Sequence, residues 1–280
     1  MADGKKIQFI AELSINHLGM VNIAKAMIKS AKEAGASFIK IKIKDVGNYY
    51  ERSKKWRNYD FKLYRKSLEL SIKDIEEINR YCKKLKIKWF STIHDKYGLE
   101  VIKKYKPPFY KIASMDGKNT ELFDLVLSQC KKDKVPLIYS TGGENKNNLE
   151  NIIDKVKKNK IKTYLLHTVS VYPTPRGHSN INYIDKLIEK YSSEDIKIGY
   201  SGHEEGYAAT LLASRKNILM IERHITLSRN YKIHHIDAAL LPNEYKNMVD
   251  LVYDMYEEDT KIVREISKKE SDFLNNKKYS

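Results

Sequence analysis

The stretch Ile7-Gln8-Phe9-Ile10-Ala11-Glu12-Leu13-Ser14-Ile15-Asn16-His17 lies near the start of the chain. Its first five residues form a short apolar run that predicts a β-strand. The turn that follows lacks the G-x-G-x-x-G pattern that opens most dinucleotide-binding, doubly wound sheets. This first unit therefore favours a closed barrel over an open α/β sheet.

The rest of the chain repeats the same unit, with short apolar runs separated by longer amphipathic segments. Strands are predicted over residues 7–11, 38–42, 88–91, 109–112, 137–140, 163–167, 196–200 and 219–222. Helices are predicted over residues 21–34, 73–84, 99–105, 122–131, 149–158, 184–191, 206–214 and from 244 onward. Eight strands, each followed by a helix, are the count of a (β/α)8 TIM barrel. We therefore predict a single α/β barrel domain over residues 1–268 and a polar, fraying tail over residues 269–280.

The composition excludes several classes of protein. Hydrophobic residues make up 41% of the 280 residues, which is enough for a large core and excludes global disorder. No run of 18 apolar residues occurs and the N-terminus lacks the apolar stretch of a secretory signal. Cys82 and Cys130 lie in helix-like segments and do not suggest a disulfide framework. We expect a cytoplasmic protein that has no membrane partner.

The net charge of +16 raises the question of nucleic-acid binding. Only nine of the 52 basic residues are arginines, and the lysines are scattered along the whole chain. No arginine-rich stripe marks a phosphate-tracking surface. A solvated lysine surface, or an anionic small substrate held by a few lysines, fits this pattern better, and we expect no nucleic-acid partner.

Barrel enzymes build their active sites at the carboxyl ends of the strands. The side chains at or just beyond those ends are unusually polar: Glu12, Asn16, His17, Lys40, Lys42, Ser91, Thr92, His94, Asp95, Lys111, Ser114, Asp116, Ser140, Thr141, His167, Thr168, Ser170, Tyr172, Ser201, His203, Glu222 and His224. Lysines combined with hydroxyl groups are typical of phosphate binding. For any single lysine, a solvated surface position remains the simpler interpretation.

Two histidines occupy equivalent positions on neighbouring predicted strands. His203 and His224 each follow the end of a strand, so their imidazoles are predicted to face the same mouth. Two neutral imidazoles at that place are suited to one divalent transition metal. Either histidine alone is better explained as a packed or surface residue, and only their joint placement favours a metal.

Eight short motifs occur in order between Ile7 and Val249. They are Ala11-Glu12-Leu13-Ser14-Ile15-Asn16-His17-Leu18-Gly19, Lys32-Glu33-Ala34-Gly35-Ala36 with Ile39-Lys40, Phe90-Ser91-Thr92, Tyr110-Lys111-Ile112-Ala113-Ser114, Ser140-Thr141-Gly142, Leu165-Leu166-His167 with Tyr172-Pro173-Thr174-Pro175, Gly199-Tyr200-Ser201-Gly202-His203, and Ile221-Glu222-Arg223-His224-Ile225-Thr226-Leu227. Together they resemble the sialic acid synthases and, more widely, the phosphoenolpyruvate-dependent nonulosonate synthases. Each motif alone is weak, but the ordered set is specific.

The resemblance implies a barrel enzyme that joins phosphoenolpyruvate to a sugar aldehyde, such as N-acetylmannosamine, and releases phosphate. The product would be a 3-deoxy-2-keto sugar acid used for surface polysaccharides. The positions that match phosphoenolpyruvate-binding residues are Lys40, Thr92, Lys111, Ser114, Ser140, Ser170 and Ser201. His203 and His224 match ligands of a divalent metal, with manganese expected, and Glu12 matches a residue that we expect to transfer a proton.

The acceptor half of the site departs from the family pattern. The positions assigned to acceptor binding are Asn16, Lys42, Tyr172, Glu204 and Asp237. Lys42 replaces a glutamine, Gly202 and Glu204 replace an aspartate and a threonine, and His235 aligns with an acid near the metal. The third metal ligand is left open between His235, Asp237 and water. We expect an altered acceptor, either shorter, phosphorylated or acidic.

Two further expectations concern the surroundings of the site. Residues 46–70 form a long aromatic and basic connection that either closes over the acceptor or makes a surface excursion. The family usually carries a small antifreeze-like domain, which we expect to be absent because about thirty residues follow Val249. A homodimer is the expected assembly.

Two other functions compete with this hypothesis. One is a metal-dependent barrel of another reaction class, such as an aldolase or an epimerase, which would not consume phosphoenolpyruvate. The other is a non-catalytic relative that binds a glycan precursor, a reading motivated by Gly202 and His235.

Overall fold

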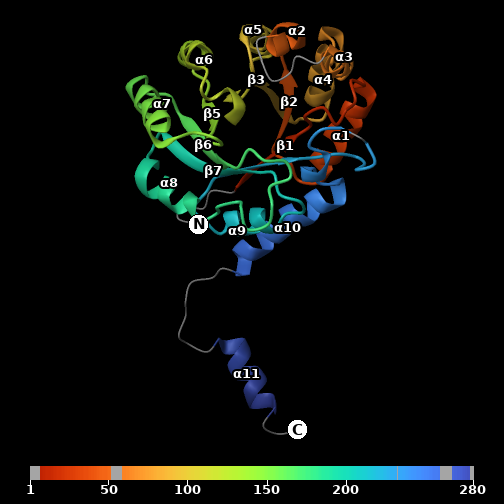
Figure 1. Ribbon diagram of the computed structural model, residues 1–280. Coiled ribbons are helices and arrows are strands. Elements are labelled where there is room, and N and C mark those ends of the chain that lie inside the picture. Colours follow the sequence, from red (N-terminus) through yellow and green to blue (C-terminus); the bar gives the residue numbers. More distant parts are fainter. Residues whose placement is uncertain (1–6, 52–58, 232, 259–266, 278–280) are drawn as a thin grey trace.

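The computed structural model describes residues 7–51, 59–231, 233–258 and 267–277, and within these ranges eight parallel strands close into a barrel in sequential order (Figure 1). The strands are β1 (Gln8–Glu12), β2 (Phe38–Ile43), β3 (Lys88–Ile93), β4 (Tyr110–Ile112), β5 (Leu137–Ser140), β6 (Thr163–Thr168), β7 (Ile196–Gly202) and β8 (Met220–His224). β1 pairs with both β2 and β8, which closes the sheet. The predicted (β/α)8 barrel is confirmed.

Helices follow the strands and pack around the barrel (Figure 1). They are α1 (Val21–Glu33), α4 (Ile72–Lys84), α5 (Lys96–Ile102), α6 (Thr120–Asp133), α7 (Lys146–Lys158), α8 (Tyr183–Tyr191), α9 (Ala208–Ser214) and α10 (Pro242–Glu258). Several begin at a side chain that caps free backbone N–H groups, as at α4, where Ser71 and Asp74 form a capping box. None of the described helices is both long and apolar enough to cross a membrane.

The connection between β2 and α4 is more ordered than the loop expected over residues 46–70. It contains α2 (Val46–Glu51) and α3 (Tyr59–Ser67), while Arg52, Trp56 and Arg57 lie outside the described residues. The ring of Phe61 in α3 lies 5.6 Å from the ring of His234, in the connection after β8. In its described part the connection therefore reaches across β1 to the connection after β8, while its closing over an acceptor stays a prediction.

The expected tail also differs from the structure. A helix, α11 (Lys268–Lys277), covers most of it, and all of its residues are exposed. The sequence carries no apolar face that would hold this helix against a core.

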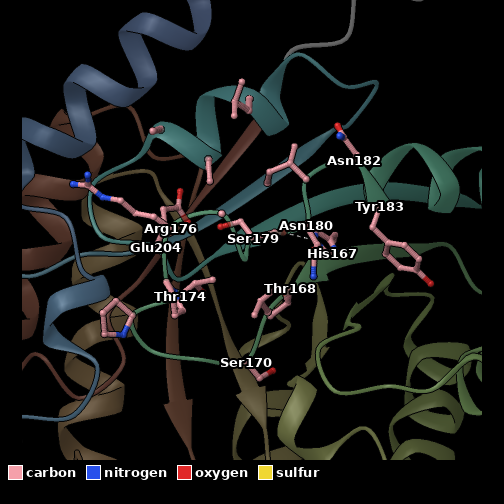
Figure 2. A pocket seen from close by; sticks show the side chains of 18 of the residues that line it. His167, Thr168, Ser170, Thr174, Arg176, Ser179, Asn180, Asn182, Tyr183 and Glu204 are labelled. Carbon is pink, nitrogen blue, oxygen red and sulfur yellow. Dashed lines mark hydrogen bonds between the residues drawn. The ribbon is translucent and has the colours of Figure 1, made fainter.

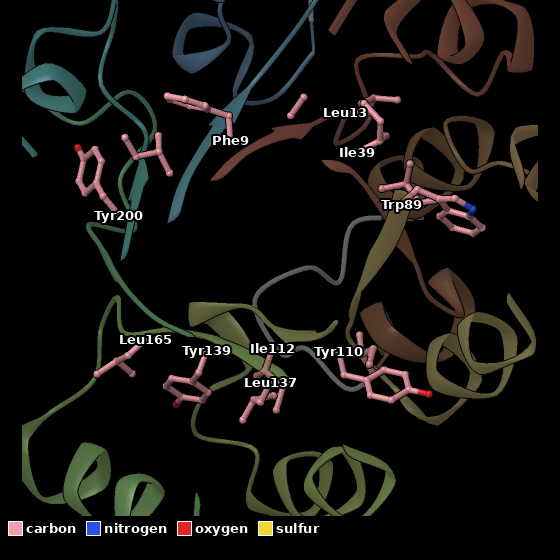
Figure 3. Packing of buried hydrophobic residues seen from close by; sticks show 14 of the residues in the cluster. Phe9, Leu13, Ile39, Trp89, Tyr110, Ile112, Leu137, Tyr139, Leu165 and Tyr200 are labelled. Atoms are coloured by element: carbon pink, nitrogen blue, oxygen red, sulfur yellow. The ribbon is translucent and has the colours of Figure 1, made fainter. Parts of the chain in front are cut away.

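Strand residues alternate between two apolar regions, because successive side chains of a strand point to opposite faces. Those that point outward pack under the helices, among them Phe9, Tyr110, Leu137 and Tyr200 (Figure 3). Those that point inward fill the lower barrel: Ile10, Phe90, Phe109, Ile138, Leu166 and Met220. These side chains fill the barrel toward the amino ends of the strands, so that the open face lies at the carboxyl ends.

Gly199 shows how tightly the interior is filled. A Cβ added there would lie 2.4 Å from Leu166 Cδ2 and 2.7 Å from the carbonyl oxygen of Met220. A side chain at this position of β7 would displace the barrel wall.

Arg223 is an exception to the apolar outer layer. Its side chain is fully buried on the outer face of β8, and its guanidinium donates to Glu204 Oε1 (2.8 Å) and Thr210 Oγ1 (2.7 Å). It also donates to the carbonyl oxygens of Glu204 (2.8 Å) and Gly206 (2.7 Å). The connection between β7 and α9 is thus tied to β8 through one buried cation.

We predict that Arg223→Met lowers the free energy of unfolding by about 3–5 kcal/mol, because it leaves the buried Glu204 carboxylate without its cation. Chemical denaturation followed by circular dichroism measures this change. Arg80→Met is the matched control, since Arg80 is exposed on α4 and its loss should change stability by less than about 0.5 kcal/mol. Equal effects of the two substitutions would contradict a stabilising role for the Arg223 network.

Candidate active site

A polar layer lies directly above the apolar filling of the barrel. Strand register places Glu12 beside Lys40, Thr92 beside Lys111, and Ser201 beside Glu222. All six side chains are buried. Each continues the inward-facing alternation of its strand, so all six point into the barrel. The predicted strand-end residues therefore converge at one mouth.

Glu222 is the centre of this layer. Its carboxylate accepts hydrogen bonds from Lys40 Nζ (2.8 Å), from Lys111 Nζ (2.8 Å to each oxygen) and from Ser201 Oγ (3.1 Å). Lys40 Nζ also lies 2.6 Å from Glu12 Oε2. Two carboxylates and two ammonium groups thus share one buried cluster.

The electrostatics of this cluster favour an ionised Glu222. Burial alone would raise the pKa of its carboxyl group, but Lys111 and Lys40 outweigh burial and hold that pKa well below its usual range. Burial lowers the pKa of Lys40, and the neighbouring Glu222 opposes this effect. The carboxylate of Glu222 therefore helps to keep ammonium charge at the mouth.

Several buried polar atoms at the mouth lack a hydrogen-bond partner among the residues that the structure describes. They include Thr92 Oγ1, Thr168 Oγ1 and Asn16 Oδ1. The amide nitrogen of Asn16 does have a partner, the carbonyl oxygen of Ile225 at 2.7 Å. Because an unpaired buried polar atom is costly, these groups fit a site that binds a polar ligand.

His203 and His224 lie together, with ring centroids 5.5 Å apart. His203 Nδ1 lies 2.8 Å from the carbonyl oxygen of Val169. When Nδ1 donates its hydrogen to this oxygen, Nε2 of the neutral ring carries no hydrogen and can act as a ligand. His224 Nδ1 is buried without a partner in the described structure. Burial lowers the pKa of His203 to about 3 and that of His224 well below its usual value, so both imidazoles are neutral.

Neutral, buried imidazoles with free ring nitrogens fit a divalent transition metal. Within the described ranges, however, no three His, Cys, Asp or Glu side chains converge on one point as ligands. His235 is half-buried and Asp237 is exposed, on the short helix η3 (Ile236–Ala238). His203 and His224 therefore remain the two predicted metal ligands, and the third stays open.

Tyr172 lies between His203 and His235. Its ring centroid lies 3.8 Å from that of His203 and 3.9 Å from that of His235. Lys42 Nζ donates to Ser14 Oγ at 3.0 Å. Tyr172, His235 and Lys42 therefore border the mouth on the side that sequence assigns to the acceptor.

Two predicted acceptor residues are not brought to the mouth. The Glu204 carboxylate accepts from Arg223, from Tyr200 Oη (3.0 Å) and from Thr210 Oγ1 (2.6 Å), on the outer face of the barrel. These hydrogen bonds hold the Glu204 oxygens in the helix layer, and its contact with the acceptor stays a prediction. Asp237 is exposed and joins no group of potential metal ligands among the residues that the structure describes.

Ser114 and Ser170 meet through their hydroxyl groups at 2.7 Å, and Ser140 is buried at the end of β5. Thr168 and Ser170 also line a pocket of about 1500 Å³ between the connections that follow β6 and β7 (Figure 2). His167 lines this pocket from the outer face of β6, where its Nε2 lies 2.8 Å from the carbonyl oxygen of Ser179. His167 is therefore a packed histidine rather than a mouth residue.

Sequence reasoning gave no role to several residues that the structure brings to the mouth. Glu222 has a clear signal, because it precedes His224 by two residues on one strand. His94 Nδ1 lies 2.6 Å from Asp116 Oδ2, and Tyr49 Oη donates to Asp116 Oδ1 at 3.0 Å. Lys44 continues the alternation of Lys40 and Lys42, whereas Arg65 in α3 has no such signal.

Comparisons with known proteins identify the family. N-acetylneuraminate-9-phosphate synthase of Drosophila melanogaster is 30% identical over 259 residues, which cover 88% of this chain and 67% of the fly protein. Pseudaminic acid synthase of Campylobacter jejuni is 30% identical over 259 residues, which cover 89% of this chain and 73% of that protein.

A solved structure shows the same architecture. The N-acetylneuraminic acid synthetase of Leptospira borgpetersenii, in complex with citrate, superposes with a TM-score of 0.83 at 27% identity. The match covers 98% of this chain and 92% of that structure. The model of the NeuB family matches residues 27–263. With this match over most of its length, the chain belongs to the NeuB family.

Proposed function

We propose that this protein is a synthase that condenses phosphoenolpyruvate with a sugar aldehyde to form a 3-deoxy-2-keto sugar acid and inorganic phosphate. The observation that carries the proposal is the buried Lys40–Glu222–Lys111 cluster, which lies among hydroxyl groups at the barrel mouth. Relatives named as synthases of N-acetylneuraminate 9-phosphate and of pseudaminic acid support it. They give no support to an aldolase, an epimerase or a non-catalytic relative.

Phosphoenolpyruvate is a small, densely charged anion, and the polar layer suits it. Lys40 and Lys111 would offset its phosphate and carboxylate charges, since charge-assisted hydrogen bonds are the strongest that side chains make. The hydroxyl groups that would complete the binding are those of Thr92, Ser114, Ser140, Ser170 and Ser201. Glu222 would orient both lysines, so that binding requires little rearrangement.

The reaction balances with water as the third reactant. Carbon 3 of phosphoenolpyruvate forms a C–C bond to the aldehyde carbon, and the aldehyde oxygen takes up a proton. A water oxygen then bonds to carbon 2 and loses a proton. Finally the C–O bond to phosphate breaks, the carbon 2 hydroxyl loses its proton as the ketone forms, and inorganic phosphate leaves.

Glu12 is our candidate for proton transfer in this sequence. It is completely buried, its Oε1 accepts from the backbone N–H of Ser14 at 2.7 Å, and its Oε2 lies next to Lys40. A carboxylate fixed in this way would serve both the phosphoenolpyruvate side and the aldehyde side. Asn16, Lys42 and Tyr172 would contact the acceptor.

His203 and His224 would hold a divalent metal, for which we propose manganese. When bound, such a metal supplies Lewis-acid polarisation of a carbonyl oxygen. Tyr172 restricts the orientation of His203 by stacking on its ring. A homodimer and a cytoplasmic location belong to the proposal on the strength of the family resemblance alone.

We predict release of inorganic phosphate from phosphoenolpyruvate with manganese and one member of a panel of sugar aldehydes. The panel covers four to six carbons, with and without acetamido and phosphate groups, and a colorimetric phosphate assay gives the rate. Activity should disappear with a chelator and return with manganese. Tight binding of phosphoenolpyruvate without release for any sugar would contradict the proposed reaction.

We predict that Lys111→Met weakens phosphoenolpyruvate binding by roughly 100-fold, because it removes a charge-assisted contact in a buried site. Metal content should stay unchanged, and calorimetry and elemental analysis measure the two quantities. Lys88→Met is the control, since Lys88 is exposed at the start of β3. Equal losses of both ligands would instead indicate a misfolded protein.

We predict that His203→Ala and His224→Ala each abolish retention of manganese through gel filtration. The reason is that each removes one of the two neutral imidazoles that the structure places together. His167→Asn is the matched control, because His167 is buried on the outer face of the barrel. Full metal content in both alanine variants would rule out this ligand pair.

A further inference from the structure

Three cations beside the mouth are not used by the phosphoenolpyruvate site. Lys42 lies on β2 two residues beyond Lys40, Lys44 follows the end of that strand, and Arg65 of α3 lies over the same Tyr50 ring as Lys44. Only 7% of Lys44 and 6% of Arg65 is exposed. Cationic side chains are seldom buried this far unless anionic groups surround them.

The described partners of these cations are mostly neutral. Lys44 Nζ donates to Tyr50 Oη at 3.2 Å and lies 4.8 Å and 5.0 Å from the ring centroids of Tyr49 and Tyr50. The Arg65 guanidinium lies 5.7 Å from the Tyr50 ring, and its buried Nε has no partner among the described residues. These contacts orient the cations without neutralising them.

Among the side chains that the structure describes, the nearby carboxylates do not balance the charge. Glu69 Oε1 lies 3.7 Å from Arg65, which is beyond a good hydrogen bond. Asp116 already pairs with His94 and Tyr49, and Asp95 is bound by backbone N–H groups of Asp45 and Gly98. The cluster of Lys42, Lys44 and Arg65, hereafter the cation cluster, therefore carries an excess of positive charge.

The pKa values of the two lysines agree with this excess. Burial, and then the charge of Arg65, lower the pKa of Lys42 to about 8 and that of Lys44 to about 7. Glu69, Lys42 and Asp116 are the other charged groups that act on Lys44. A bound anion would offset the repulsion that lowers both values.

The cation cluster faces the acceptor side of the mouth. The ring of His234 lies 5.9 Å from the ring of His235, which in turn contacts Tyr172. α3 also contacts the connection after β8 through Phe61 and His234. Lys42 lies one inward-facing position beyond Lys40, so an anion at the cluster would lie beyond phosphoenolpyruvate, toward the rim.

We propose that the cation cluster binds a phosphate ester at the end of the acceptor sugar that is remote from its aldehyde. This inference rests on the proposed function and specifies its second substrate. A phosphate dianion matches three cations better than a single carboxylate does. A guanidinium forms paired hydrogen bonds to phosphate oxygens, and the two ammonium groups act as point charges.

The test uses acceptors that bind but cannot react. N-acetylmannosaminitol 6-phosphate and unphosphorylated N-acetylmannosaminitol are titrated calorimetrically into the manganese-loaded full chain. We expect the phosphorylated alditol to bind at least roughly tenfold more tightly. Lys44→Met and Arg65→Gln should each remove most of this difference and leave the affinity for the unphosphorylated alditol unchanged.

Lys29→Met is the matched control, because Lys29 is an exposed cation on α1 that should not affect either ligand. Arg65→Lys keeps the charge and should retain part of the preference. Unchanged melting temperatures would show that the variants fold. Equal binding of the two alditols, or tighter binding of a carboxylate-bearing counterpart, would overturn the phosphate subsite.

Turnover separates this inference from the proposed function. Phosphate release is measured with N-acetylmannosamine and with its 6-phosphate under identical conditions. Equal kcat/KM for both acceptors would overturn the subsite and leave the synthase function intact. No turnover with either acceptor, together with selective binding of the phosphorylated alditol, would support the subsite and contradict the proposed reaction.

Discussion

The shared ion pair of Glu222 with Lys40 and Lys111 is the interaction on which the mouth of this barrel depends. Two ammonium groups in a buried layer would repel each other and lose hydration, and one carboxylate between them offsets both costs. Its hydrogen bonds come from three different strands, β2, β4 and β7. The cluster therefore orders the polar layer across the whole width of the barrel rather than along one edge.

The alternation of strand side chains decides which residues can join this layer. On β8, Met220 fills the lower interior, Glu222 holds the lysines and His224 lies at the top, while Arg223 between them is tied into the outer layer. Two buried charged networks thus lie back to back on one strand. The Arg223 network joins the outer layer to β8, and the Glu222 network holds the lysines that we propose bind phosphoenolpyruvate.

The parts of the site that lie on strands could be predicted from the sequence, because a period of two assigns each residue to a face. Lys40, Thr92, Lys111 and Ser201 all lie where that rule puts them. The rule fails just beyond a strand. Glu204 follows β7, where the backbone turns toward α9, so its carboxylate meets Arg223 instead of the mouth. Arg65 lies outside any strand, and only the packing of α3 brings it near Lys44.

The two helices between β2 and α4 have a consequence for how such an enzyme diversifies. α2 and α3 lie in the connection between β2 and α4 and contribute no strand to the barrel. Substitutions in these two helices therefore leave the Lys40–Glu222–Lys111 layer intact. If the acceptor is recognised there, as proposed, substrate preference can drift through mutation of one connection while the bond-forming chemistry is inherited unchanged. Selection can then act on the two halves of the site separately.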